Sequence, residues 1–220
     1  RSPGTILEGK YRLGEKIGAG GFGAVFRATH LGLNRPIAVK IFRPTPGNDS
    51  VQAVERFKRE GVSAARLNHP NVVTVLDSGV SPDGIAYLVM ELLEGRSLAE
   101  ELHARRRLTV RRTAQILHAA SLALAEAHRI GIIHRDIKPE NIFLHQTEQG
   151  EIIKVVDFGI AKLMEEAGAE AHKLTATSSI VGTPSYMAPE RLRNQDYDGR
   201  SDVYSLGVVF YECVCGRTPF

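Results

Sequence analysis

The sequence predicts an α+β protein in which a strand-rich first part is joined to a mainly helical second part. Short apolar runs with alternating or β-branched residues, bounded by Gly, Pro or Asn, are typical of strands. In the first part such runs cover residues 11–17, 24–29, 37–42, 72–76 and 85–91. In the second part apolar residues recur at helical spacing over Val110–His128 and Ser201–Cys215. The pattern changes across Glu91–Gly95, where we expect a hinge.

The remaining elements are predicted from the same signals. Helical spacing over Val51–Leu67 predicts a helix in the first part, although Gly61 in its interior costs about 1 kcal/mol relative to Ala. Thr109 is a candidate N-cap for the long helix of the second part. Two short strands, Ile142–Leu144 and Ile152–Val156, flank a polar turn.

Composition is ordinary for a soluble folded protein of 220 residues, with 43% hydrophobic and 24% charged residues. A formal net charge of +3 is too small to argue for nucleic acid as the partner. The densest basic stretch, residues 105–112, holds five arginines, and we expect it to be a solvated connection between helices. The apolar stretches are too short, or are broken by Glu, so we expect no membrane contact within this segment.

The two chain ends and the two cysteines bear on the protein's compartment. The chain opens on Arg1, with neither an initiator Met nor a signal peptide, and stops at Phe220, so we expect a fragment of a longer protein. Cys213 and Cys215 lie two residues apart in a helical segment and point to different faces, which disfavours a disulfide. We expect both thiols to be reduced, buried and structural, in a cytoplasmic compartment.

The first motif that carries chemistry is a G-x-G-x-x-G loop. Its glycines, at positions 18, 20 and 23, let backbone N–H groups come close to phosphate oxygens. A dinucleotide-binding fold uses the same spacing, but it has a helix directly after the glycines and an acidic residue about 20 positions on. Here an alternating strand follows and the next strand carries Lys40, so that alternative is rejected. A Walker A loop is also excluded, because the sequence contains no Gly-Lys-Ser/Thr.

Lys40 ends an apolar strand, and Glu60 lies on the helix that we expect to follow. An ion pair between them would hold the Lys40 ammonium over the phosphates of a nucleotide. Glu60 taken singly also fits a plain solvated helix face, since its neighbours Lys58 and Arg59 are charged. The pairing therefore depends on the other motifs.

A charged stretch, residues 134–141, lies between two apolar runs, which is unusual for a surface turn. Phosphoryl transfer needs a carboxylate that orients the attacking hydroxyl and accepts its proton, which Asp136 can supply. Asn141 offers an oxygen to Mg²⁺, and Lys138 places a cation near the transferred phosphate. Asp157, in the Asp-Phe-Gly sequence after a buried-looking strand, suits Mg²⁺ because this hard ion takes oxygen ligands.

The last motif is Gly182–Glu190, which ends in Ala-Pro-Glu. A polar segment rich in Thr and Ser precedes it, with a run of hydroxyl residues at 175–179. Such a run is usually a linker. Between the Asp-Phe-Gly and Ala-Pro-Glu sequences it becomes a candidate phosphorylation switch.

Together these motifs, in this order from about Tyr11 to Phe220, resemble the eukaryotic-like serine/threonine protein kinases, and in finer detail those of bacteria. A lysine two residues after the catalytic aspartate, here Lys138, is typical of Ser/Thr rather than tyrosine kinases. The resemblance implies a bilobal, protein kinase-like fold with a β-rich N-lobe and a mainly helical C-lobe that lacks its last helices. It implies a partial kinase domain over residues 1–220, with the N-lobe at 11–91 and the C-lobe at 92–220.

The same resemblance implies roles for individual residues. The catalytic residues would be Asp136, Lys138 and Asn141, and the metal ligands would be Asn141 and Asp157. The nucleotide-binding residues would be Ile17, Gly18, Ala19, Gly20, Gly21, Phe22, Gly23, Val25, Ala38, Lys40, Glu60, Met90, Glu91, Leu93 and Phe143. Within that set Met90 would be the gatekeeper, the backbones of Glu91 and Leu93 would bind adenine, and Val25, Ala38 and Phe143 would sandwich its ring. The candidate phosphorylation sites are Thr175 and Thr177, and the supporting residues would be Arg135, Thr183, Glu190 and Asp202.

As implied by the resemblance, the activity is transfer of the γ-phosphate of ATP, with Mg²⁺ or Mn²⁺, to Ser/Thr hydroxyls of proteins, including the chain's own activation loop. A homodimer for trans-autophosphorylation and a membrane anchor beyond Phe220 are further expectations. Because the last helices normally supply an arginine to the Ala-Pro-Glu glutamate, we expect Glu190 to lack its partner. Two alternatives stay open: a nucleotide-binding pseudokinase or scaffold, and a catalytically inert truncated fragment. A small-molecule kinase is disfavoured, because Gly182–Glu190 matches a segment that shapes a peptide-binding ledge.

Overall fold

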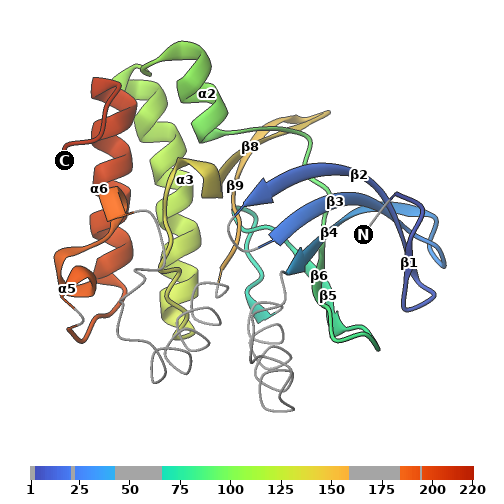
Figure 1. Cartoon of the computed structure of the whole chain (residues 1–220). Helices are drawn as coiled ribbons and strands as arrows, with labels where there is room; N and C mark the ends of the chain where they lie inside the picture. The colour runs from blue at the N-terminus through green and yellow to red at the C-terminus, as the bar shows by residue number, and fades with distance from the viewer. Residues whose placement is uncertain (1–2, 21–22, 43–65, 159–183, 194) are drawn as a thin grey trace. The chain divides into compact units, whose positions relative to one another are not determined.

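The computed structural model describes residues 3–20, 23–42, 66–158, 184–193 and 195–220. The chain divides into two compact units (Figure 1). The first comprises Arg1–Arg66 and Thr74–Leu93, and the second comprises Leu67–Val73 and Glu94–Phe220. The described helices all belong to the second unit, and the described strands divide between a six-stranded sheet in the first and a three-stranded sheet in the second.

The first unit is built on an antiparallel sheet with the strand order β1-β2-β3-β4-β6-β5. Its strands are β1 (Ile6–Leu7), β2 (Tyr11–Gly20), β3 (Gly23–His30), β4 (Arg35–Phe42), β5 (Val75–Val80) and β6 (Ala86–Met90). Because side chains alternate along a strand, this sheet has two different faces. One face carries an apolar core of its own: Leu13, Phe26, Ala28, Ile37, Val39, Ile41, Tyr87 and Val89, joined by Leu7 and Tyr11.

The sheet curls strongly. β2 and β5 lie far apart in the strand order, yet the Tyr11 hydroxyl on β2 donates a hydrogen bond to the carboxylate of Asp77 on β5. The Tyr11 ring also packs edge-on against Tyr87, with 6.2 Å between ring centroids. Burial raises the pKa of Tyr11, and its hydrogen bond to Asp77 raises it further. This buried contact therefore joins strands at opposite sides of the sheet around the core.

The second unit packs helices against a small sheet of order β7-β8-β9. Its strands are β7 (Gly95–Ser97), β8 (Ile142–Thr147) and β9 (Gly150–Val155), and its helices are α2 (Leu98–Arg105), α3 (Val110–Arg129), α5 (Pro189–Leu192) and α6 (Arg200–Cys215). Thr109 caps α3 by accepting the Arg112 amide, as the sequence predicts. Helices α3 and α6 lie side by side (Figure 1), and their apolar residues, with Leu98, Ile142 and Val155, form one buried core.

The structure corrects the predicted strand at 72–76. β5 begins only at Val75, and Val72 instead makes an isolated parallel bridge to Val155 in the second unit. The sequence patterns also did not predict β1, β7, α2 or α5, although α2 opens with a capping box in which Ser97 and Glu100 bond each other's amides. The helix predicted over residues 51–67 lies outside the described residues, apart from its last two positions.

The prediction for the cysteines is wrong in one respect. Cys213 is fully buried in α6, and burial together with the nearby Glu212 carboxylate raises its pKa to about 12, which suits an inert structural thiol. Cys215 is exposed rather than buried. Both thiols are free. Among the described helices, none is long and apolar enough to cross a membrane.

Gly23 offers a test of how closely β3 and β4 approach. Its φ is +151°, and a Cβ added there would lie 2.0 Å from the carbonyl oxygen of Ile41. We predict that Gly23→Ala lowers the free energy of unfolding by at least about 2 kcal/mol, because the backbone must shift. Gly18→Ala is the matched control: its Cβ would meet Val25 at 3.7 Å, an ordinary contact. Equal denaturation midpoints for the two variants would contradict this prediction.

Candidate functional site

In the first unit, the predicted nucleotide-binding residues gather on the sheet face opposite the apolar core. Val25 on β3 pairs with Lys40 on β4, and Ala38 pairs with Met90 on β6. Directly paired residues share a face, as do residues two apart on one strand. The pairing therefore puts a lysine beside small and apolar side chains, an arrangement that can hold an anion next to a flat apolar ring. Lys40 is only 6% exposed, and its ammonium lies 5.7 Å from the centroid of the Phe42 ring.

The predicted adenine-binding segment follows β6. The Glu91 amide donates to the carbonyl of Thr74 and its carboxylate accepts the Thr74 amide at 2.7 Å. The Leu93 backbone makes no hydrogen bond with any residue in the described part of the chain. Leu93 is half-buried, and its amide and carbonyl, unbonded within the described residues, suit a ligand that carries its own donor and acceptor.

The glycine-rich loop is described only in part. Ile17, Gly18, Ala19 and Gly20 end β2, and Gly23 opens β3. Gly18 pairs with Val25, so it lies on the same face as Lys40. Gly21, Phe22 and Glu60 lie outside the described residues, so the predicted pair between Lys40 and Glu60 stays a prediction.

In the second unit, three predicted catalytic residues meet at one carboxylate. Lys138 Nζ lies 2.9 Å from Asp136 Oδ2, and Asn141 Nδ2 lies 3.2 Å from the same oxygen. Asn141 Nδ2 also donates to the Asp136 backbone carbonyl at 2.7 Å. The turn that brings these residues together is the 3₁₀ helix Pro139–Asn141. Both donors engage Oδ2, so Oδ1 has no partner among the residues that the structure describes.

His134, which the motif contains but the sequence analysis gave no role, links two parts of the site. It is completely buried. Its Nε2 donates to the carbonyl of Val156 at 2.8 Å, so its Nδ1 is the acceptor for the Asp136 amide, 3.2 Å away. One imidazole thus connects the backbone of Asp136 with the residue before Asp157. The only signal in the sequence was a histidine at the point where an apolar run meets the charged stretch 134–141.

The residue before Asp157 is bonded to Asn141. The Val156 amide donates to the Asn141 carbonyl at 3.0 Å, which brings the end of the β9 segment to the 3₁₀ turn. The Asn141 amide nitrogen is occupied by Asp136, which leaves the Asn141 side-chain oxygen as the acceptor. A carboxylate and an amide oxygen from adjacent segments fit Mg²⁺, which takes few protein ligands and completes its shell with water and phosphate oxygens.

Asp202, at the start of α6, anchors this loop. Its Oδ2 accepts the His134 amide at 2.8 Å and His128 Nε2 at 2.8 Å, and its Oδ1 accepts the Arg135 amide at 2.9 Å. Burial alone would raise the pKa of Asp202, but the hydrogen bond from His128, the proximity of His134 and the two amides outweigh it. The pKa of this carboxyl therefore lies below its ordinary value.

The other predicted residues are placed as follows. Phe143 lies on β8 and pairs with Ser97 and Lys154. Glu190 accepts a hydrogen bond from Ser201 Oγ at 2.9 Å, and the expectation that it lacks its arginine partner stays a prediction. Thr175, Thr177 and Thr183 lie outside the described residues.

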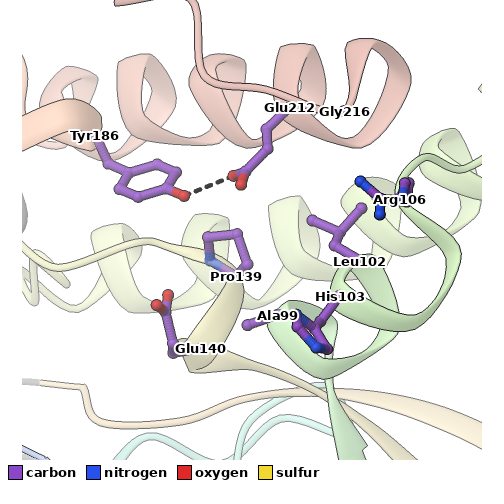
Figure 2. Close-up of a pocket in the computed structure, with 9 residues that line it drawn as sticks. All are labelled: Ala99, Leu102, His103, Arg106, Pro139, Glu140, Tyr186, Glu212 and Gly216. Carbon is purple, nitrogen blue, oxygen red and sulfur yellow. Dashed lines mark hydrogen bonds between the residues drawn. The ribbon is translucent and has the colours of Figure 1, made fainter.

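A pocket of about 380 Å³ opens on the second unit beside the 3₁₀ turn (Figure 2). It is lined by Ala99, Leu102, His103, Arg106, Pro139, Glu140, Tyr186, Glu212 and Gly216. The Tyr186 hydroxyl donates to Glu212 at 2.6 Å across one wall. The lining carries the acidic residues Glu140 and Glu212 and the basic residues His103 and Arg106, so it suits a polar or charged ligand better than an apolar one.

Comparisons with known proteins agree on one family. A family model described as the protein kinase domain matches residues 11–220. The chain is 40% identical over 218 residues to serine/threonine-protein kinase pkn3 of Myxococcus xanthus, covering 99% of this chain and 40% of that protein. It is 41% identical over 217 residues to PknB of Mycobacterium tuberculosis, covering 97% of this chain and 34% of PknB. The crystal structure of the M. tuberculosis PknI kinase domain matches with a TM-score of 0.78 and 29% identity, over all of this chain and 79% of that one.

The Asp202 anchor predicts a pH-dependent stability. We expect Asp202→Asn to lower the free energy of unfolding at neutral pH by about 2–4 kcal/mol, because buried amide and imidazole donors lose a charged acceptor. A carboxyl whose folded-state pKa is depressed stabilises above its unfolded-state pKa, and this contribution is lost as pH falls through the folded-state pKa. The difference between wild type and variant should therefore shrink in acid, measured by denaturant unfolding at several pH values.

The matched control is Asp198→Asn. Asp198 lies four residues before Asp202, but it is exposed, and its carboxylate accepts hydrogen bonds only from Arg200 among the described residues. Its unfolding midpoint should stay at the wild-type value. A gap between wild type and Asp202→Asn that does not change with pH would refute the assignment of the depressed pKa to Asp202.

Proposed function

The chain belongs to the protein kinase family, and from this premise we propose that it transfers the γ-phosphate of ATP to Ser/Thr hydroxyls of proteins. The chain spans about two fifths or less of the length of the curated relatives that it matches, so the activity of the whole protein is part of the proposal. Residues 1–220 form the kinase domain in this proposal, with the N-lobe at 11–91 and the C-lobe at 92–220.

The observation that carries the proposal is the pair of donors on one oxygen of Asp136. Lys138 and Asn141 both engage Oδ2, which fixes the carboxylate and leaves Oδ1 to accept the proton of a substrate hydroxyl. Lys138, already beside Asp136, also supplies positive charge where negative charge develops on the transferred group. The geometry therefore combines a held base with a nearby cation.

ATP with Mg²⁺ or Mn²⁺ supplies the transferable phosphoryl group and the charge that stabilises it. In the second unit, Asn141 and Asp157 would hold the metal through their side-chain oxygens. In the first unit, Lys40 and the glycine-rich strand ends would bind phosphate, and the apolar residues around Ala38 would bind the base. The Glu91–Leu93 backbone would hydrogen-bond the adenine edge.

Protein substrates are the proposed acceptors, and they include Thr175 and Thr177 of another copy of this chain. A homodimer that supports this trans reaction, a cytoplasmic location and an anchored parent protein complete the proposal. A pseudokinase or scaffold gains no support, because Lys40, Asp136, Asn141 and Asp157 are all retained. An inert fragment is the alternative that experiment must exclude.

The first test removes the proposed base. Asp136→Asn keeps the shape of the side chain but cannot accept a proton, so we expect phosphate incorporation to fall by roughly 10²–10⁴-fold. Phosphatase-treated protein is incubated with Mg-ATP and its intact mass is followed with time. Asp196→Asn changes an exposed residue outside the catalytic loop, and this variant should incorporate phosphate at the wild-type rate. A dephosphorylated wild type that gains no phosphate would overturn the proposed activity for this chain.

A second test isolates the metal. A ligand that binds only the folded chain raises its melting temperature by mass action. We expect Mg-ATP to stabilise wild type more than ATP in excess EDTA does, and Asp157→Asn to lose that difference while still responding to ATP alone. The readout is thermal shift over a nucleotide titration. An undiminished Mg²⁺ effect in Asp157→Asn would exclude Asp157 as a ligand.

A further inference from the structure

The guanidinium of Arg135, the residue before Asp136, is held by Tyr197 from the segment between α5 and α6. Arg135 Nε donates to the Tyr197 hydroxyl at 2.8 Å. The same guanidinium carbon lies 5.7 Å from the centroid of the Tyr197 ring. Hydroxyl and ring therefore contact one side chain in two ways, through a directional hydrogen bond and through the attraction of a cation to an aromatic face.

Arg191 on α5 holds the backbone of the same residue. Its Nη1 donates to the carbonyl oxygen of Arg135, and its guanidinium carbon lies 5.2 Å from the Tyr197 ring centroid. Tyr197 thus has guanidinium groups from both Arg135 and Arg191 near its ring. That carbonyl belongs to the peptide group that joins Arg135 to Asp136, and the amide of the same peptide group donates to His134 Nδ1. Both ends of this peptide plane are therefore fixed by side chains.

The backbone at this point needs such support. Arg135 has a φ of +71°, in the left-handed region that residues other than glycine rarely adopt. A conformation of this kind costs about 1–3 kcal/mol and persists only where the surroundings determine it. Asp202 holds the amide of Arg135 from one side, while Arg191 and Tyr197 hold its carbonyl and side chain from the other.

We propose that Tyr197 is a positioning residue for phosphoryl transfer: with Arg191 it fixes Arg135, and through Arg135 it orients the peptide that presents the Asp136 carboxylate. The inference rests on the proposed function only in taking Asp136 as the base. Tyr197 acts through Arg135 rather than on the substrate, so its removal should lower turnover and leave nucleotide binding unchanged.

The test is Tyr197→Phe, which keeps the ring near both guanidiniums and removes only the hydroxyl. A purified Asp136→Asn copy of this chain is the protein substrate, and trans-phosphorylation is measured with radiolabelled Mg-ATP over a range of ATP concentrations. We expect kcat to fall by roughly 3–10-fold, the worth of one hydrogen bond, with KM for ATP unchanged within about 2-fold. The melting temperature should stay within about 2 °C of wild type.

Tyr211→Phe is the matched control, because Tyr211 is a half-buried tyrosine of α6 whose hydroxyl makes no hydrogen bond within the described part of the chain. The kcat of Tyr211→Phe should equal the wild-type value. The Tyr197→Phe change is also made in an Arg135→Lys variant, because lysine has no Nε–H to donate to the Tyr197 hydroxyl. If Tyr197 works through Arg135, adding Tyr197→Phe to Arg135→Lys should change kcat by less than about 1.5-fold.

The outcomes separate this inference from the proposed function. A wild-type chain without activity refutes the proposed function before Tyr197 is tested. An active wild type with normal kcat in Tyr197→Phe refutes the positioning role alone. The same loss of kcat in both the wild-type and Arg135→Lys backgrounds also refutes it, because Tyr197 would then act independently of Arg135. A raised KM for ATP or a large drop in melting temperature assigns Tyr197 to binding or to stability instead.

Discussion

The second unit depends on one buried carboxylate. Asp202 is 1% exposed, and its two oxygens accept two consecutive backbone amides of the catalytic loop and the imidazole of His128. These bonds join α6 and α3 to the loop that carries Asp136. Burying a charged carboxylate is costly, so it is tolerated only where hydrogen-bond donors such as these surround it. The geometry of the loop follows from the two helices, because α6 presents the carboxylate and α3 presents the histidine.

Two of the five non-glycine residues with positive φ in the described part of the chain lie where the chemistry is proposed. Arg135 and Asp157 both have positive φ values, of 71° and 68°. Such conformations need hydrogen bonds that outweigh their cost, and His134 supplies bonds to both segments from a single buried ring. In the first unit the equivalent constraint is strand register. The pairing of Val25 with Lys40 and of Ala38 with Met90 separates a ligand-binding face from the apolar core, because a shift of one residue would exchange the two faces.

Much of the fold could be predicted because its signals are local. Apolar periodicity located most of the strands and both long helices, and Thr109 marked the start of α3. The errors have physical causes. Val72 has the composition of a strand residue, but it pairs with Val155, a partner more than 80 positions away that no local pattern reveals. α2 has only eight residues, and its two buried leucines, Leu98 and Leu102, are too few to show a helical period, so its capping box was the clearer sign. Cys215 follows a buried cysteine by two residues, which turns it to a different face of α6.

The sequence by itself determined the family, the order of the motifs and the identity of the residues proposed for chemistry, because these depend on residue type and spacing along the chain. Only the tertiary structure decided how those residues are held. It showed that Lys138 and Asn141 share one oxygen of Asp136, that His134 joins Asp136 to the segment before Asp157, and that Ser201 bonds Glu190. It also brought Tyr197 to Arg135 across 62 positions of sequence. The physical reason is that hydrogen bonds depend on distances of about 3 Å and on direction, which chain packing sets and residue order does not.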